Sequence, residues 1–254
     1  MKITSTLLAL LVAPLLVGTV GNEALAGEKA PCGLTYSPFV KGTVWNYEYI
    51  VPPGVEEKAG LKVNAPDTIS ITVEEVLTEK GLTTITLKES YRKVDQKVVL
   101  SCSKSGLEIP PQSFFFNGEP GGARGVDLAE LKMTGQKAFP KGNLKAGLSL
   151  FTEIKGNVVR KSSNKDVKHP NARIEMERQL NVGGTEEVVT NAETYKAIGV
   201  EIIVSGRVFI ESGAGKERNM PAMKSLMWFA KNVGLVQVYN RFGHGWRLVT
   251  KTSP

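Results

Sequence analysis

The stretch Trp228-Phe229-Ala230-Lys231-Asn232-Val233-Gly234-Leu235-Val236-Gln237-Val238 predicts a β-hairpin. In it, two runs of strand-forming residues flank a short centre, Lys231-Asn232-Val233-Gly234. Asparagine and glycine adopt the backbone angles that hairpin turns require more readily than other residues do. Large aromatic side chains stand at the start of the hairpin. Because similar runs recur along the chain, we expect the hairpin to be part of one larger sheet.

Much of the chain outside this hairpin alternates apolar and polar residues, which is the pattern of half-buried strands. One such strand carries Trp45 and Tyr47 on a single face. The segments that we predict as strands cover residues 44–51, 68–78, 82–94, 98–102, 107–109, 148–159, 172–182, 186–189, 195–210, 224–230, 235–239 and 246–250. We expect turns at Asp95-Gln96 and Gly183-Gly184, and a break in the 195–210 segment at Ser205-Gly206.

The number of strands indicates the fold class. About a dozen strands with only one or two helices exceed the average strand content of a globular domain. Open sheets of this size curl or split rather than stay flat. We therefore predict a mainly β fold, a large curved antiparallel sheet of half-barrel-like shape with one or two short helices. One of these helices is expected from Val126 to Met133, with Asp127 near its start.

Residues 1–26 have the layout of a secretory signal peptide. A lysine precedes an apolar run over residues 7–17, and Ala24-Leu25-Ala26 provides the small residues of a cleavage site. A membrane anchor is the alternative, but Pro14 interrupts a run that is already shorter than the roughly 20 apolar residues of a span. We expect an exported protein, periplasmic or secreted and not integral to the membrane, whose residues 27–254 form a single antiparallel β domain.

The chain contains two cysteines, Cys32 and Cys102, and two histidines. In an oxidising compartment such a pair predicts a disulfide, and two separate buried thiols are the alternative. The cross-link would close a loop of about 70 residues, for which the chain-entropy model gives about 4 kcal/mol of stabilisation. Two cysteines so far apart, with so few histidines, do not favour a structural zinc site. We expect no metal and no cofactor.

The formal net charge of the chain is +7, and its sequence pI is about 9.3. A basic surface attracts anionic partners such as acidic polysaccharides, lipid headgroups or nucleic acid. The alternative is a solvated basic surface that only keeps the protein in solution, and we favour it for an exported protein. The expected compartment argues against nucleic acid as a partner.

Few residues of the chain form patterns that are typical of catalytic or ligand-binding sites. His169 and His244 lie in turn regions without a second ligand or a carboxylate at suitable spacing, so we expect both to be solvated loop residues. The glycine-rich stretch 118–125 lacks the Lys-Ser/Thr pair of a phosphate-binding loop. We expect Phe114-Phe115-Phe116 to pack in the core, with a cavity lining or a sheet-edge cover as alternatives. The strand aromatics could stack on a sugar, although core packing is the commoner role.

Three stretches resemble a group of exported bacterial proteins of unknown function. Residues 36–47 resemble its "Y-x-P-L-x-x-G-x-x-W-x-Y" opening, and residues 192–198 resemble its "A-G-T-F/Y-x-A/C" element. Residues 228–236 are similar to its closing "W-Y/F-A-x-G-V-G-L-V" element. Glu193 and Asn232 depart from these motifs at positions where glycine is usual.

This resemblance implies the fold of the periplasmic lipoprotein-carrier and lipoprotein-receptor proteins, a curved antiparallel half-barrel with helices on its concave side. The group has no established catalytic residues to carry over. The carriers bind lipid chains inside the half-barrel, so the resemblance implies a ligand of the same kind here.

We therefore expect a non-enzymatic binding protein that holds an apolar ligand, a lipid or an acyl chain, on the concave face. The residues that we expect to line this ligand are Trp45, Phe114, Phe115, Phe116 and Trp228. A second hypothesis is a cell-envelope assembly module that binds another envelope protein through a sheet edge or the basic surface. A third hypothesis is a hydrolase of an envelope polymer, which needs two carboxylates or a Ser-His pair in one cleft.

Overall fold

The computed structural model of the protein describes residues 35–55, 65–120, 126–136, 139–140, 144–160, 172–191, 193–210 and 216–254. These residues form 13 strands and one short helix, α1, over Phe114–Asn117. The strands are β1 Val44–Ile50, β2 Thr68–Glu79, β3 Leu82–Tyr91, β4 Val94–Ser103, β5 Gly106–Glu108, β6 Val126–Gly135, β7 Phe139–Pro140, β8 Ser149–Arg160, β9 Ala172–Val189, β10 Thr194–Ile210, β11 Lys216–Ala230, β12 Gly234–Tyr239 and β13 Gly245–Thr252. The predicted signal peptide, Cys32 and His169 lie outside the described residues.

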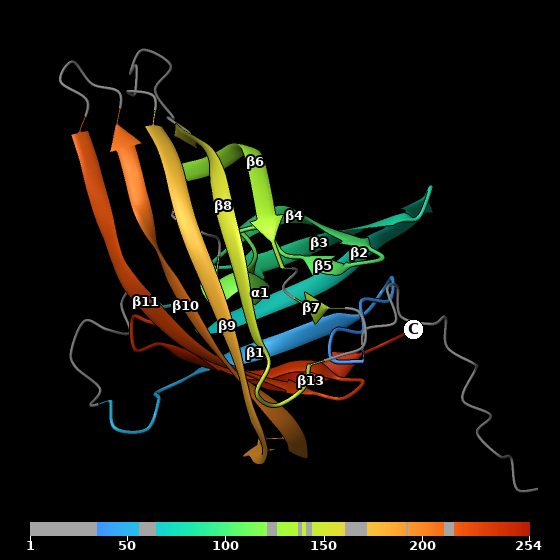
Figure 1. Ribbon diagram of the computed structural model, residues 1–254. Helices are drawn as coiled ribbons and strands as arrows, with labels where there is room; N and C mark the ends of the chain where they lie inside the picture. Colours follow the sequence, from blue (N-terminus) through green and yellow to red (C-terminus); the bar gives the residue numbers. More distant parts are fainter. Residues whose placement is uncertain are drawn as a thin grey trace, which may run out of the picture.

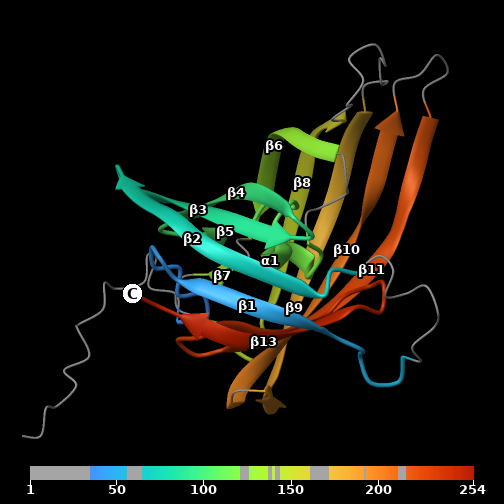
Figure 2. The ribbon, with the colours of Figure 1, turned by 180° about the vertical axis from the view of Figure 1, so that it is seen from behind.

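All 13 strands join one sheet in the order β6-β8-β9-β10-β11-β12-β13-β1-β2-β3-β4-β5-β7. The two end strands, β6 and β7, do not pair with each other in the described chain, so the sheet is open. It curves into a half-barrel, and β8 to β11 rise side by side beyond the other strands (Figure 1). The view from behind shows α1 inside the curve (Figure 2). The predicted fold class, a large curved antiparallel sheet, is confirmed.

Helix α1 is short because strong signals define both of its ends. Ser113 is its N-cap, and the Ser113 hydroxyl accepts a hydrogen bond from the Phe115 N–H at 3.2 Å. Gly118 ends the helix with a φ of 75° and donates its N–H to the Phe114 carbonyl at 2.8 Å. A Cβ atom at Gly118 would stand 2.2 Å from Val238 Cγ2, so glycine is required there for space as well as for backbone angle.

The main core lies between α1 and the sheet. Phe114 packs against Tyr47 and Trp246, with ring centroids 5.4 and 5.9 Å apart. Phe115 meets Trp45 edge-on at 6.0 Å. All five side chains are at most 4% exposed. Because burial of each large apolar side chain contributes roughly 1.5–3 kcal/mol, this cluster holds α1 in place.

The hairpin that the sequence predicts is present. β11 ends at Ala230 and β12 begins at Gly234. Asn232 and Gly234 have φ angles of 60° and 101°, left-handed values that asparagine and glycine tolerate. Trp45 Nε1 donates a hydrogen bond to the Val233 carbonyl at 2.7 Å, which ties the turn to β1.

The predicted helix over residues 126–133 is wrong, because this segment belongs to β6 and pairs with β8. A bulge interrupts the pairing, and Glu130 has a φ of 53° there. The extra residue shifts the alternation of side chains along the strand. Leu128, Leu131 and Met133 thereby acquire a spacing that resembles one face of a helix.

Three predicted breaks in the strands do not occur. Asp95-Gln96 lies inside β4, and the chain turns at Arg92-Lys93 instead, where both residues have positive φ. β9 runs through Gly183-Gly184 and β10 runs through Ser205-Gly206. Each of these two pairs coincides with a register shift, so the small residues mark bulges rather than turns. β9, β10 and β11 are therefore 18, 17 and 15 residues long and extend beyond α1 (Figure 1).

Candidate functional site

The sheet has two faces that differ in their surroundings. We call the side that packs against α1 the inner face and the opposite side the outer face. Side chains alternate between the faces along a strand, and register partners share a face. The guanidinium carbon of Arg178 on β9 lies 4.6 Å from the ring centre of Phe116 on α1. This contact assigns Arg178, and with it Met176 and Leu180, to the inner face.

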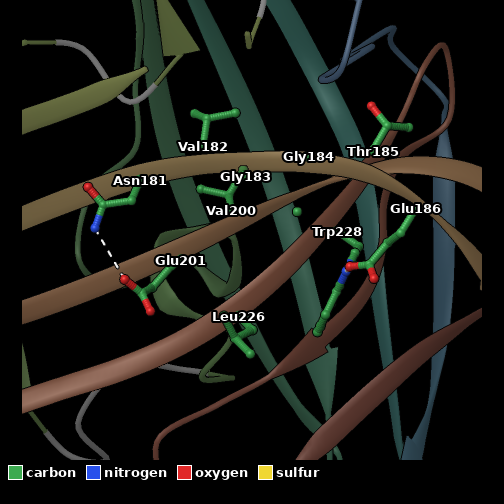
Figure 3. Close-up of a pocket in the computed structure, with 11 residues that line it drawn as sticks. Asn181, Val182, Gly183, Gly184, Thr185, Glu186, Val200, Glu201, Leu226 and Trp228 are labelled. Carbon is green, nitrogen blue, oxygen red and sulfur yellow. Dashed lines mark hydrogen bonds between the residues drawn. The ribbon is translucent and has the colours of Figure 1, made fainter. Parts of the chain in front are cut away.

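The five residues predicted to line a ligand do not form one surface. Trp45, Phe114, Phe115 and Phe116 are at most 4% exposed and surround or belong to α1. A ligand that touched them would have to displace the helix. Trp228 is half-buried on the outer face, where it lines a groove (Figure 3). The ligand-lining role of these residues stays a prediction.

A row of apolar residues crosses the inner face of five strands. The register joins Met133 of β6 to Ile154 of β8, and Ile154 to Met176 of β9. It continues from Met176 to Gly206 of β10 and from Gly206 to Met220 of β11. We call these five residues the methionine row. Because neighbouring strands are about 4.8 Å apart, the row is about 19 Å long.

The methionine row is partly open to solvent. Ile154 is buried, whereas the three methionines of the row are half-buried. Gly206 has no side chain, and the end of the Met220 side chain lies over it, 3.0 Å from where a Cβ atom would stand. Met223 and Met227 also lie on the inner face of β11, through their pairing with inner-face residues of β10, so every methionine in the described ranges is on this face. Methionine is flexible and polarisable, and it suits surfaces that adapt to varied apolar partners.

Arg178 lies at the foot of the methionine row, two residues from Met176 along β9. It is 1% exposed, and its Nε and Nη2 atoms have no hydrogen-bond partner among the residues that the structure describes. Burial lowers the pKa of Arg178 to about 9, so the side chain is still cationic at neutral pH. Its contact with the Phe116 ring offsets part of the desolvation cost, by up to about 2 kcal/mol. An unpaired buried charge costs several kcal/mol, so this offset is incomplete.

Glu89 of β3 is a second buried charge beside α1. It is fully buried, and its Oε1 atom accepts hydrogen bonds from the Ser113 hydroxyl and the Phe114 N–H, both at 2.9 Å. Its Oε2 atom has no partner. Burial raises the pKa of Glu89 to about 7, against the lowering effect of these two hydrogen bonds. The carboxyl group therefore anchors the start of α1.

A groove of about 560 Å³ crosses β9, β10 and β11 on the outer face (Figure 3). It forms at a bulge where Gly183, Gly184 and Gly199 carry no side chains. A Cβ atom at Gly199 would lie 3.5 Å from Trp228 Nε1, so a side chain there would intrude between the lining groups. The lining residues are Asn181, Val182, Gly183, Gly184, Thr185, Glu186, Gly199, Val200, Glu201, Leu226 and Trp228.

The polar side chains of the outer groove bind one another. The Trp228 indole N–H donates to the Glu186 carboxylate, and Asn181 Nδ2 donates to Glu201 Oε2 at 3.2 Å. Lys224 forms an ion pair with Glu201, and its hydrogen bond lowers the pKa of that carboxyl group. A carboxyl group that acts as a general acid needs a raised pKa instead. The Glu201 carboxylate is therefore poorly suited to act as a general acid.

His244 is not the solvated loop residue that the sequence predicts. It is 8% exposed, and its ring centroid lies 6.1 Å from that of Tyr49 and 5.8 Å from that of Trp246. The His244 N–H donates to Asn240 Oδ1 at 3.1 Å, which closes the turn between β12 and β13. This turn packs against β1, a contact between distant parts of the chain that local sequence does not indicate.

Cys102, one half of the predicted disulfide, lies on the inner face of β4 and is 2% exposed. It shares this face with Val98 and Leu100, as predicted, and both are buried. In the ranges that the structure describes, no cysteine is a free thiol. Cys32 lies outside those ranges, so its pairing with Cys102 stays a prediction.

Two further findings concern the described ranges as a whole. They contain no group of three or more histidine, cysteine, aspartate or glutamate side chains placed to hold a metal ion. The helix within them is too short and insufficiently apolar to cross a membrane. Several acidic side chains instead pair with basic ones at the surface, as Glu175 does with Arg207 at 3.0 Å.

Sequence reasoning missed Arg178, although a signal was present. Ile174, Met176, Arg178 and Leu180 stand at every second position of a strand. A charged residue within the apolar set of an alternating strand is expected to be buried. The methionine row itself could not be predicted, because it depends on the register of five strands that are far apart in the sequence.

Comparisons with known proteins identify the fold but no family. No protein-family model matches the chain, and no curated protein sequence matches it. A candidate lipoprotein from Parabacteroides distasonis has a similar solved structure, with a TM-score of 0.54 and 15% identity over 86% of this chain and 98% of its own. A candidate exported protein with a YmcC-like fold from Bacteroides fragilis gives a TM-score of 0.43 and 13% identity over 84% of this chain and 97% of its own. At this identity the first likeness extends to the fold alone.

Proposed function

We propose that this is an exported, non-enzymatic binding protein that holds an apolar ligand, a lipid or an acyl chain, on the inner face of the half-barrel. The methionine row is the observation that carries the proposal. It presents flexible apolar side chains, half open to solvent, in the hollow of a curved sheet. Concave and mostly apolar surfaces are the usual binding sites of small molecules.

The proposed surface lies beside the aromatic cluster that the sequence indicates, not within it. α1 covers the part of the inner face where Trp45 and Trp246 are buried. The methionine row lies on β6 and on β8 to β11, and the last four of these strands rise beyond α1 (Figure 1). A ligand on the row can therefore bind while α1 stays in place.

The dimensions of the methionine row suit an extended hydrocarbon chain. Its length of about 19 Å, four spacings between strands, is comparable with that of a long acyl chain. Each methylene group that the ligand buries contributes about 0.8 kcal/mol. Contact along the whole row therefore provides affinity without any polar bond.

The predicted signal peptide supports export, as does the similar fold of a candidate lipoprotein, since lipoproteins belong to the cell envelope. In an aqueous compartment outside the cytoplasm, a lipid or acyl chain requires a carrier that shields it from water. A curved sheet whose inner face carries half-buried apolar side chains suits that role.

A charge placed on each face of β11 tests the proposal. Met220→Glu introduces a carboxylate into the methionine row, and Leu226→Glu is the matched control on the outer face of the same strand, where Leu226 is 36% exposed. We expect Met220→Glu to weaken binding of radiolabelled palmitate by about tenfold or more, because a buried charge faces the chain. Leu226→Glu should bind as the wild type does. A folded Met220→Glu variant with unchanged affinity would exclude the methionine row as the site.

One observation favours the second candidate function, binding of an envelope protein through the outer groove. Leu226 and Trp228 lie together there and keep part of their apolar surface exposed (Figure 3). Partly exposed tryptophans are enriched at protein interfaces. In this case Trp228→Ala abolishes cross-linking to a partner in envelope extracts and leaves palmitate binding unchanged. Loss of palmitate binding instead would place the lipid in the outer groove.

A further inference from the structure

Among the described residues, the Nε and Nη2 atoms of the Arg178 guanidinium group have no hydrogen-bond acceptor. Its register partners are Thr152 on β8 and Val204 on β10. The Thr152 hydroxyl donates to the Gln136 carbonyl at 2.6 Å. Val204 is apolar, and Phe116 presents the face of its ring. Arg178 is therefore buried among groups that do not neutralise it.

A second arginine, on the neighbouring strand, is paired with carboxylates. Arg207 of β10 lies on the outer face, half exposed, and its guanidinium binds Glu175 at 3.0 Å and Glu217 at 3.3 Å. The exposed arginine thus has two carboxylate partners, whereas the buried one has none in the described part of the chain. Because burial of an unpaired charge is costly, an arginine in this position indicates an anion that the protein binds.

The two unpartnered nitrogen atoms of Arg178 are placed to donate two hydrogen bonds to one anion. Nε and Nη2 lie on the same edge of the guanidinium plane and donate in parallel directions. A carboxylate accepts two such parallel bonds through its two oxygens. Because Arg178 is only 1% exposed and packs against Phe116, a carboxylate reaches it only when neighbouring side chains move aside, and the small size of a carboxylate keeps that movement small.

We infer that Arg178 binds the carboxylate of a long-chain fatty acid whose hydrocarbon chain lies along the methionine row. This inference rests on the proposed function and adds the head group of the ligand. The charge and the apolar row are continuous on one face, since Met176 is two residues from Arg178 and shares its orientation. One amphiphile can therefore contact both.

Binding of palmitate and of methyl palmitate, measured side by side on the wild-type protein, tests this inference. The two ligands share the chain, and only palmitate has the charge. We expect palmitate to bind about tenfold more tightly or better, since a hydrogen bond to a charged group in a buried site has an effect of that order. Equal affinity for the two ligands overturns the inference and leaves the proposed function standing. Absence of binding for both overturns the inference and the proposed function together.

Variants of the two arginines complete the test. Arg178→Met keeps most of the side-chain volume and removes the charge, and Arg207→Met is the matched control on the outer face. We expect Arg178→Met to lose the preference for palmitate over its methyl ester, and Arg207→Met to retain it. The melting temperature of ligand-free Arg178→Met should equal or exceed that of the wild type, because an unpaired charge has been removed. A lower melting temperature with an unchanged preference for palmitate would mean that Arg178 has only a structural role.

A phospholipid could present an anion to the same guanidinium. Dipalmitoyl phosphatidic acid is therefore the third ligand, and we expect it to bind more weakly than palmitate, because its head group and second chain are too large for a site so fully buried. Tighter binding of the phospholipid, dependent on Arg178, would overturn the assignment of a carboxylate.

Discussion

Two neighbouring rows of residues on the same five strands have opposite characters. The inner one is the methionine row. The outer one, a single residue away along each strand, consists of Lys132, Lys155, Glu175, Arg207 and Asn219. Arg207 in the outer row binds two carboxylates, whereas Arg178 beside the inner row binds none within the described ranges. The charge of Arg207 is thus neutralised by its partners, whereas the inner row presents apolar side chains next to a buried arginine that has no carboxylate partner in the described residues.

This difference separates stabilising features from candidate functional ones. The outer groove has the shape of a binding site, but its carboxylates already bind Trp228, Asn181 and Lys224. The inner face instead carries buried polar atoms of Arg178 and Glu89 that have no hydrogen-bond partner among the described residues. Groups that are buried without a partner are rare in folded proteins, so Arg178 calls for an explanation, and the proposed carboxylate supplies one.

The two faces should differ most in how much stability the protein loses when an aromatic residue is removed. Phe114→Ala should lower the free energy of unfolding by about 3–5 kcal/mol, because it empties a fully buried position between Tyr47 and Trp246. Trp228→Ala on the outer face should lower it by less than about 2 kcal/mol, since that ring is half exposed. Urea unfolding of both variants measures these values. Equal losses would mean that α1 is not the centre of the core.

The predicted cross-link concerns the inner face as well. If Cys32 pairs with Cys102, Cys102→Ser should lower the free energy of unfolding by about 4 kcal/mol, the chain-entropy value for a loop of about 70 residues. Ser103→Ala, on the opposite face of the same strand, should change it by less than about 0.5 kcal/mol. The wild-type mass should also lie two hydrogens below that of the reduced chain. A mass that reduction does not change would contradict the pairing.

Glu89 makes the stability of the inner core depend on pH. Its pKa is raised from an ordinary 4.5 to about 7, so the folded protein holds a proton that the unfolded chain releases between these pH values. The free energy of unfolding should therefore fall by up to about 3 kcal/mol as the pH rises from 4.5 to 7, and then stay constant. Tyr47, whose pKa is raised well above its usual range by burial and by Glu89, does not titrate in this window.

Substitution of Glu89 isolates this effect. Glu89→Gln should remove most of the fall in the free energy of unfolding with rising pH, because an amide does not titrate. The amide oxygen still accepts the hydrogen bonds of Ser113 and Phe114. Urea unfolding at pH 4.5 and at pH 8 measures the difference between the variant and the wild type. The same decline in both proteins would assign the pH dependence to other groups.

The smallest loss of stability is expected for a substitution in the outer row. Arg207→Met should lower the free energy of unfolding by less than about 1 kcal/mol, and high salt should reduce even this loss, because exposed ion pairs are weak and screened. Arg178→Met should leave the stability of the ligand-free protein unchanged or raise it. Thermal unfolding at low and high salt compares the two variants. A large loss for Arg207→Met would contradict the view that the outer row contributes little.

Much of the fold could be predicted from the sequence because its signals are local. Asn232 and Gly234 mark the hairpin through the backbone angles that they tolerate. Alternation identified most strands, and it also places Cys102 on the buried side of β4. Several of the errors arose at bulges: the bulge at Glu130 made β6 resemble a helix, and the bulge at Gly183-Gly184 resembled a turn.

The candidate site could be predicted only in part. The concave face follows from the resemblance to the lipoprotein carriers, but the aromatic residues chosen to line it are mostly packed around α1. Arg178 could have been found, since it interrupts an apolar alternation. The alignment of Met133, Met176 and Met220 could not, because strand register between distant segments is set by the whole sheet.

Native mass spectrometry of the protein purified from the exported fraction of expressing cells, before and after organic extraction, tests the central claim most directly. We predict an added mass that extraction removes, that is absent from Met220→Glu, and that is retained by Leu226→Glu. A wild-type protein that shows only its own mass, even after incubation with palmitate, would contradict the assignment of a lipid or acyl chain to the inner face.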